Sequence, residues 1–134
     1  MIVAAGKEGR AQAGVTVSEA TAGNTGLGLA LVARAKGYRV ILVIPDKMSA
    51  EKVLHLKALG AEIRMTRSDV TKGHAEYYQD MAARLAADIP RAFYANQFGN
   101  PANPMAHEPT TGPAIRGQMQ LRLNAVVRGG GAGG

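Results

Sequence analysis

Short apolar runs alternate along the chain with segments whose apolar residues recur at helical spacing. The run 39–44, RVILVI, is apolar after its first residue and rich in β-branched side chains. Such continuous runs are typical of strands covered on both faces, as in parallel sheets. The other predicted strands are 15–18, 62–66, 92–95 and 124–128, and the predicted helices are 1–12, 25–36, 50–60, 74–88 and 111–121.

Residues that favour helix ends and turns mark the boundaries of these segments. Gly37 follows the helix predicted over 25–36, where a glycine C-cap is expected. Ser49 is placed to cap the next helix, and Glu51 lies in its first turn, where the helix dipole favours a carboxylate. The segment 100–104, NPANP, is rich in residues that begin turns, so we predict a turn there.

The alternation of strands and helices predicts an α/β fold. Short connections between alternating elements are typical of parallel strands joined by crossover helices. We therefore predict a three-layer, open, twisted parallel sheet with helices on both faces. Residues 1–128 are expected to form a single α/β domain, and residues 129–134, GGGAGG, to be the truncated start of a glycine-rich loop.

Composition narrows the classes of function. The 134 residues include no cysteine, which excludes disulfides and thiolate chemistry. No apolar stretch is long enough to span a bilayer, and the N-terminus does not resemble a secretory signal, so a cytoplasmic location is expected. The net charge is +6, but the 16 Lys and Arg are scattered along the chain. We therefore expect neither a nucleic-acid partner nor a membrane partner.

The segment 18–30, SEATAGNTGLGLA, lies at a predicted strand–helix junction. Its glycines do not follow the G-x-G-x-x-G order of dinucleotide-binding loops, and it has no lysine for a Walker loop. Backbone N–H groups at a helix N-terminus favour an anion, and Gly23 and Gly26 would let a ligand approach the backbone. A capped helix start with glycines that serve packing explains the pattern equally well.

Two further segments could contribute to the same site. Asn96 and Gln97 follow a predicted strand, and ligands of open parallel sheets bind beyond the carboxyl ends of the strands. Gln97 could share a site with the loop after the first strand, or bond to backbone as a polar loop residue. The run 129–134 could form a nest of N–H groups for a phosphate, or a flexible tail. The three histidines do not cluster, so no metal is expected.

An ordered set of motifs connects these segments. In sequence order they are TAGNTG at 21–26, PDKMS at 45–49, LGAE at 59–62, NQF at 96–98, NPANP at 100–104 and TTGP at 110–113. Together they resemble the pyridoxal-phosphate-dependent cystathionine β-synthase and cysteine synthase (O-acetylserine sulfhydrylase) family over essentially the whole chain. The resemblance implies the smaller domain of a tryptophan-synthase-β-like fold, pyridoxal 5′-phosphate as cofactor, and β-replacement chemistry.

The resemblance also implies a role for each segment. The residues implied to bind the α-carboxylate of an amino-acid substrate are Thr21, Ala22, Gly23, Thr25 and Gln97. The residues implied to bind the cofactor are Asn24, at its phenolic oxygen, and Gly131, Ala132, Gly133 and Gly134, at its phosphate. Serine or O-acetylserine would react with a thiol, homocysteine or sulfide, to give cystathionine or cysteine. The full-length enzyme would be a homodimer.

The lysines depart from the family pattern. The family binds its cofactor covalently through a lysine in an S-x-K-D-R-like segment, and these residues contain no such segment. The six lysines present are Lys7, Lys36, Lys47, Lys52, Lys57 and Lys72. We therefore expect a fragment that is inactive alone and carries no catalytic residue. The alternative is a non-catalytic α/β module that binds a small carboxylate or a partner protein.

Overall fold

A computed structural model of the chain describes residues 1–21, 23–120, 122–127 and 129. The chain divides into two compact units: Ile2–Asn96, called the first unit below, and Gln97–Gly134 with Met1, called the second unit. The expected domain over 1–128 and the loop over 129–134 stay predictions, because most of that loop lies outside the described residues.

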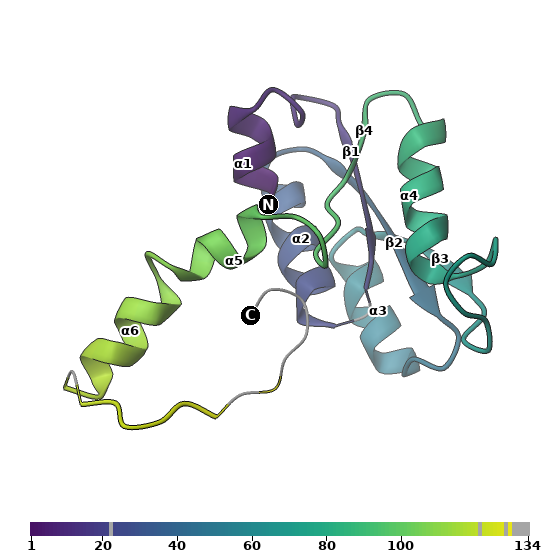
Figure 1. The fold of residues 1–134 in the computed structure, drawn as a ribbon. Helices are drawn as coiled ribbons and strands as arrows, with labels where there is room; N and C mark the ends of the chain where they lie inside the picture. Colours follow the sequence, from purple (N-terminus) through teal and green to yellow (C-terminus); the bar gives the residue numbers. More distant parts are fainter. Residues whose placement is uncertain (22, 121, 128, 130–134) are drawn as a thin grey trace. The chain divides into compact units, whose positions relative to one another are not determined.

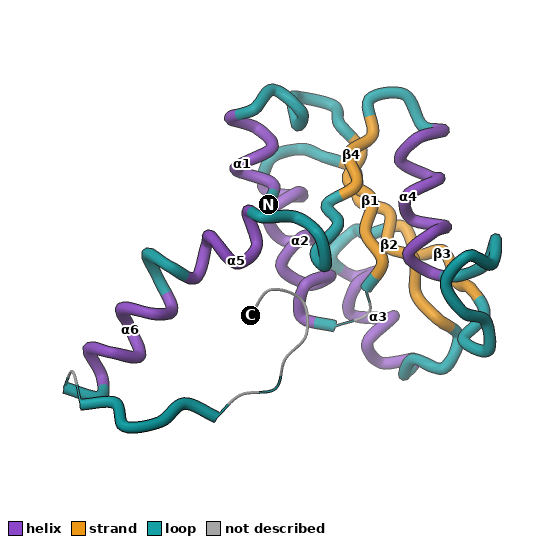
Figure 2. Tube along the Cα trace, in the orientation of Figure 1, coloured by secondary structure: helices purple, strands orange, loops and turns teal. Residues whose placement is uncertain are grey.

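A four-stranded parallel sheet forms the centre of the first unit (Figure 1; Figure 2). Its strands, in the spatial order β3-β2-β1-β4, are β1 (Thr16–Ala20), β2 (Arg39–Pro45), β3 (Glu62–Thr66) and β4 (Ala92–Tyr94). Its helices are α1 (Ile2–Lys7), α2 (Asn24–Ala35), α3 (Ala50–Ala58) and α4 (Tyr78–Asp88). Every neighbouring pair of strands is parallel, which confirms the predicted α/β fold.

Neighbouring side chains of β2 assign the helices to the two faces of the sheet. The Leu42 side chain lies close to Gly26 of α2 and Leu56 of α3. The next residue, Val43, packs with Ala82 of α4. Because successive residues of a strand point to opposite faces, α2 and α3 cover one face and α4 covers the other, as Figure 1 shows.

The apolar run of β2 is buried, as expected for a central strand. Residues 40–44 are each 5% exposed or less, because both faces of the strand are covered. By contrast, β3 is an edge strand and leaves Arg64 and Met65 exposed. A charged side chain on an edge strand discourages pairing with another chain.

Local cap chemistry sets the helix ends. The Ser49 hydroxyl accepts the N–H of Lys52 at 3.4 Å, which confirms the predicted cap of α3. Helix α4 begins four residues later than predicted, at Tyr78. The preceding residues form turns instead, in which the N–H of His74 donates to the carbonyl of Thr71 at 3.1 Å.

The turn predicted over 100–104 is wrong in its second half. Asn100 does begin a turn, since its carbonyl accepts the N–H of Asn103 at 3.0 Å. The chain then continues into helix α5 (Ala102–His107). Pro104 lies in the first turn of this helix, where its missing N–H breaks no helical hydrogen bond.

The second unit contains α5 and α6 (Thr111–Gln118), neither of which has a buried residue. Helix α6 confirms the helix predicted from residue 111. The strand predicted over 124–128 is wrong for residues 124–127, which are irregular, and residue 128 lies outside the described residues. A strand needs a neighbour to pair with, and the described part of this unit has none. No helix in the described residues is long and apolar enough to cross a membrane.

Gly26 lies where α2 approaches the sheet closely. A Cβ at this position would lie 3.1 Å from Thr21 Cγ2 and 3.3 Å from Leu42 Cδ1. We expect Gly26→Ala to lower the free energy of unfolding by about 1–3 kcal/mol, because the core would be overpacked. The control Gly28→Ala, whose Cβ would meet nothing within 4 Å, should raise it by about 0.5–1 kcal/mol. Urea denaturation measures both, and equal effects would contradict the packing role.

Candidate functional site

The strand order places a topological switch point between β1 and β4. β2 pairs with one side of β1, and β4 pairs with the other. In open parallel sheets, ligands bind outside the carboxyl ends of the strands at such a point. The N–H of Ala95, just after β4, donates to the carbonyl of Ser18 at 2.9 Å, so the ends of the two strands lie side by side. The loop from β1 to α2 leaves the sheet here.

Thr21 begins this loop and is fixed by two hydrogen bonds. Its N–H donates to the carbonyl of Val43 in β2 at 3.2 Å. Its hydroxyl oxygen accepts the N–H of Gly23 at 3.3 Å. Thr21 is buried, so the sheet sets the position of its hydroxyl at the edge of the loop. Ala22 lies outside the described residues.

The N-cap position of α2 carries no capping side chain. Gly23 is the N-cap residue, in an extended conformation with φ −107°, and no side chain bonds to the first turn from this position. A Cβ at Gly23 would meet nothing within 4 Å. The open helix end can therefore be approached by an anion, which backbone N–H groups and the helix dipole stabilise.

The two glycines of the loop thus serve different purposes. Gly23 faces open space, as a ligand-binding loop requires, whereas Gly26 is packed against Thr21 and Leu42. The packing explanation drawn from the sequence therefore holds for Gly26, and ligand binding at Gly23 stays a prediction. The expectation that Gly26 lets a ligand approach the backbone is not supported, because core side chains occupy that space.

The remaining polar residues of the loop suit an anion or a phenolic oxygen. Asn24 is exposed at the first position of α2, and Thr25, next to it, is half-buried. An amide group and a hydroxyl are both able to donate to a carboxylate or a phenolate. The donor set of the loop therefore fits the carboxylate of an amino acid and the phenolic oxygen of pyridoxal phosphate.

The structure does not test the other predicted site residues. Gln97 belongs to the second unit, where it is buried and its carbonyl accepts from Asn103 Nδ2 at 3.0 Å. Residues 131–134 lie outside the described residues. Their assignments, and that of Ala22, stay predictions.

Two ionisable side chains lie in the sheet beside the switch point. Glu19 of β1 is fully buried, and its Oε1 accepts the N–H of Ala20 at 2.9 Å. Burial, and then the Glu19 carboxylate, raise the pKa of Tyr94 far above its usual range, so this phenol stays protonated at neutral pH. Neither residue stands out as a site residue from the sequence alone. The signal that could have found Glu19 is a carboxylate within a strand next to the candidate loop.

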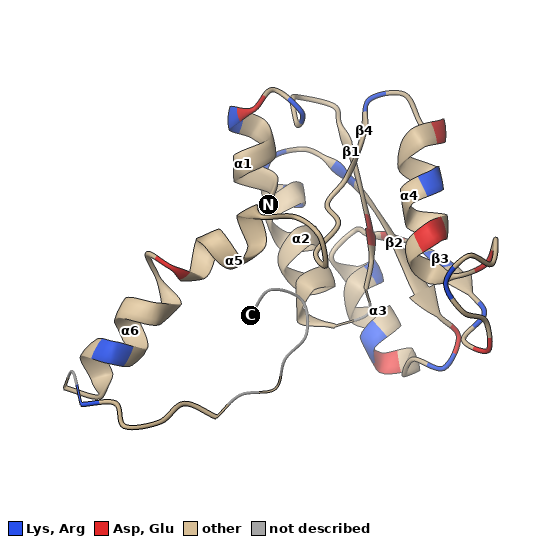
Figure 3. Ribbon diagram, in the orientation of Figure 1, with Lys and Arg blue, Asp and Glu red and all other residues tan. Residues whose placement is uncertain are grey.

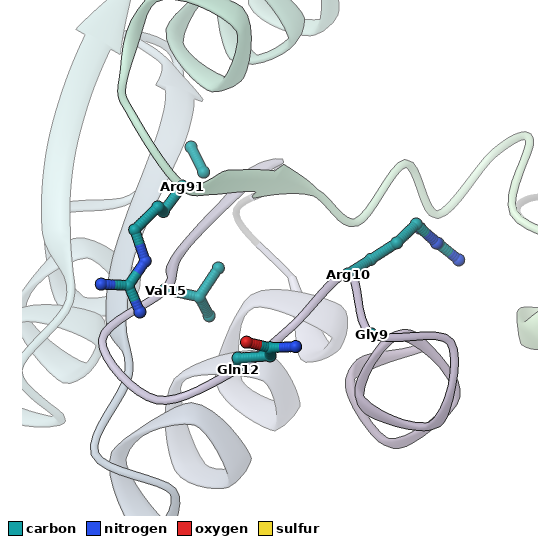
Figure 4. A pocket seen from close by; sticks show the side chains of 6 residues that line it. Gly9, Arg10, Gln12, Val15 and Arg91 are labelled. Carbon is teal, nitrogen blue, oxygen red and sulfur yellow. The ribbon is translucent and has the colours of Figure 1, made fainter.

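A separate pocket of about 200 Å³ lies at the amino ends of the strands, where β1 and β4 begin (Figure 4). The residues that line it are Gly9, Arg10, Gln12, Val15, Arg91 and Ala92. Both arginines already have partners: Arg10 pairs with Glu8 and lies 4.9 Å from the centroid of the Phe93 ring, and Arg91 donates to the carbonyl of Ala13. The pocket is lined by residues at the start of β1 and β4 and includes none of the residues of the loop after β1.

Charged residues are distributed over several elements rather than gathered on one (Figure 3). Exposed ion pairs include Arg39 with Glu62 at 3.2 Å and Arg67 with Asp69 at 2.7 Å. The hydrogen bond from Arg67 lowers the pKa of the Asp69 carboxyl. Such exposed pairs contribute little to stability. Within the described residues, no group of three or more potential ligands could hold a metal ion.

The chain is similar in sequence to known proteins over its whole length. A family model described as pyridoxal-phosphate dependent enzyme matches residues 1–134. The chain is 43% identical to a cystathionine beta-synthase of Dictyostelium discoideum over 134 residues, which is all of this chain and 27% of that protein. It is 44% identical to a cystathionine beta-synthase of Oryctolagus cuniculus, again over all of this chain and over 24% of the relative.

A bacterial relative also matches the whole chain, at a comparable identity. The match to cysteine synthase A of Salmonella typhi is 41% identical over 134 residues, all of this chain and 41% of that protein. The chain thus spans less than half the length of each of these relatives. These matches confirm the resemblance that the ordered motifs indicate. Residues 1–134 belong to the family of pyridoxal-phosphate-dependent enzymes.

Proposed function

We propose that the loop between β1 and α2 binds the α-carboxylate of an amino-acid substrate in a β-replacement enzyme. The observation that carries the proposal is the N-terminus of α2, where the N-cap residue is Gly23, with no side chain to cap the helix, and which follows β1 at the switch point. The partial positive charge of the first helical turn stabilises an anion. Similarity to cystathionine beta-synthases and a cysteine synthase supports an amino-acid carboxylate as that anion.

The proposed contacts use donors of the loop itself. The Thr21 hydroxyl would donate a hydrogen bond to the carboxylate while its oxygen still accepts the N–H of Gly23. A hydroxyl has one donor and two acceptor positions, so both bonds are compatible. Thr25 would add a second hydroxyl, and Ala22 and Gln97 would complete the set. A hydrogen bond to a charged group contributes about 1.5–3 kcal/mol.

Asn24 would contact the cofactor at its phenolic oxygen, and residues 131–134 would begin the loop around its phosphate. Asn24 is exposed, so its amide is accessible to a ligand at the helix end. When bound, pyridoxal phosphate withdraws electrons from the substrate Cα and so eases loss of the β-substituent. The loop would orient serine or O-acetylserine through its carboxylate, and the thiol would be homocysteine or sulfide.

We further propose that these 134 residues act as part of a larger homodimeric enzyme and are inactive by themselves. None of the six lysines lies in the family's S-x-K-D-R-like segment, and all six are exposed. The chain also spans only 27% of its Dictyostelium relative.

Reduction with borohydride tests this proposal. The purified chain is incubated with pyridoxal phosphate, reduced, digested and mapped by mass spectrometry. We expect weak labelling spread over several lysines and no turnover of O-acetylserine with sulfide. A stoichiometric adduct on one lysine, together with turnover, would contradict the proposal.

A non-catalytic module that binds a small carboxylate is the second candidate. It is favoured by Ala22, which stands where the family commonly carries a hydroxyl residue. Titration with pyridoxal phosphate, followed by NMR at the side-chain amide of Asn24, separates the two. A shift of this signal supports the enzymatic proposal. A chain that binds L-serine but leaves this signal unchanged at saturating cofactor favours the module.

A further inference from the structure

Glu19 is a buried carboxyl group for which the proposed chemistry has no use. Among the buried residues in the described part of the chain, it is the one with an ionisable side chain, and it is 0% exposed. Burying a carboxylate is costly unless hydrogen bonds hold it. Glu19 lies in β1, an inner strand of the sheet, two residues before Thr21. Its burial therefore needs a structural explanation.

The hydrogen bond between the Ala20 N–H and the Glu19 side chain lies just beyond the last pair of residues that joins β1 and β4. The register of the two strands ends at Ser18 opposite Tyr94. Soon after, Asn96 takes a left-handed conformation with φ 49° and turns the chain away. Just beyond this point the Glu19 Oε1 accepts the N–H of Ala20 at 2.9 Å. A side chain thus holds the last residue of β1.

Glu19 also lies on the face of the sheet that carries α2. It is in register with Leu42 of β2, and residues paired in a parallel ladder point to the same face. The Leu42 side chain lies close to Gly26 in the first turn of α2. The Glu19 side chain is therefore on the side of the strand from which the candidate loop departs.

We propose that Glu19 is a positioning residue for the carboxylate-binding loop. Its acceptor oxygen fixes the Ala20 backbone, and the bond from the Thr21 N–H to Val43 fixes the next residue. Together the two bonds aim the Thr21 hydroxyl and the start of α2 at the ligand. This inference rests on the proposed function for its effect on binding, but its effect on the backbone is independent of any ligand.

The role requires an acceptor and not a negative charge. A negative charge near a bound carboxylate would weaken binding, so the benefit comes from the hydrogen bond. Glu19→Gln keeps the oxygen and removes the charge, whereas Glu19→Leu removes the oxygen and keeps similar volume. Glu62→Gln is the matched control, because Glu62 lies in edge strand β3 and pairs on the surface with Arg39 and Arg64.

The experiment compares these three variants with the unaltered chain in two measurements. Amide hydrogen exchange at Thr21 and Gly23 reports the backbone without ligand, and NMR titration with L-serine reports the affinity. We expect Glu19→Leu to speed exchange at both amides at least tenfold relative to β3 amides and to weaken L-serine binding at least tenfold. Glu19→Gln should stay within threefold in both, and Glu62→Gln should change neither.

Each outcome either supports or overturns the positioning role of Glu19. A folded Glu19→Leu variant with unchanged exchange and affinity overturns it. If Glu19→Leu does not fold, Glu19→Gln decides: near-normal values support the role of the acceptor, and a tenfold loss in a folded protein overturns it. If the unaltered chain does not bind L-serine, the proposed function fails. The exchange measurement then decides the positioning role of Glu19 by itself.

Discussion

Replacing Leu42 with alanine is expected to lower the free energy of unfolding by about 3 kcal/mol and the melting temperature by about 10 °C. Leu42 is 0% exposed in the central strand β2 and lies close to Leu56 and to Gly26, where α2 and α3 meet the sheet. Truncation removes buried apolar area and leaves a cavity that a close-packed core does not fill. Domains of this kind are stable by only about 5–15 kcal/mol, so the loss is large.

The matched control is Leu54→Ala. Leu54 lies in α3 and is 65% exposed, so its truncation removes little buried area. We expect its free energy of unfolding to stay within about 0.5 kcal/mol of the unaltered chain. Urea denaturation followed by circular dichroism measures both variants. Similar losses at the two positions would show that Leu42 is not in the core of the sheet.

Replacing Thr21 with valine is expected to weaken binding of L-serine by about 10- to 100-fold. Valine keeps the volume but removes the hydroxyl, which is proposed to donate to the carboxylate and which accepts the N–H of Gly23. One hydrogen bond to a charged group contributes about 1.5–3 kcal/mol, and 1.4 kcal/mol corresponds to tenfold in affinity. Isothermal titration calorimetry measures the change.

Thr71→Val is the control for this loss. Thr71 is exposed in the turns before α4 and is not part of the loop between β1 and α2, so its replacement should leave the affinity unchanged. Circular dichroism establishes that both variants are folded. A folded Thr21→Val variant that binds L-serine as tightly as the unaltered chain would remove Thr21 from the site.

The elements best predicted from the sequence are those whose pattern is set by burial. The run RVILVI reads as a strand covered on both faces because both faces of β2 are in fact covered. Ser49 reads as a cap because a cap bond involves residues only three apart. By contrast, the segment 100–104 contains turn residues that also begin a helix, and local preference alone does not separate the two.

Long-range contacts explain what the sequence did not predict. Gly26 has the same local pattern as Gly23, and only the approach of Leu42 from β2 shows that it serves packing. The burial of Glu19 depends on β2, β4 and the helices around them, none of which its neighbours in sequence reveal. Residues 124–127 have strand-like composition, but a strand also needs a partner.

The order of the strands places the loop after β1 at the switch point of the sheet. The sequence predicts strands and the motif TAGNTG, but not that β4 pairs with β1 on the side opposite β2. That pairing makes the end of β1 a switch point. The resemblance names the residues of the site, and the strand order gives a physical reason why a ligand would bind there.

The loop between β1 and α2 is proposed to bind an amino-acid carboxylate. The most direct measurement is a ¹H–¹⁵N NMR titration of the unaltered chain with L-serine, with inorganic phosphate as the competing anion. We expect saturable shifts confined to Thr21, Gly23, Asn24, Thr25 and their neighbours, and much weaker shifts there with phosphate. L-serine shifts that centre on Arg10 and Arg91, or their absence at saturating concentrations, would contradict it.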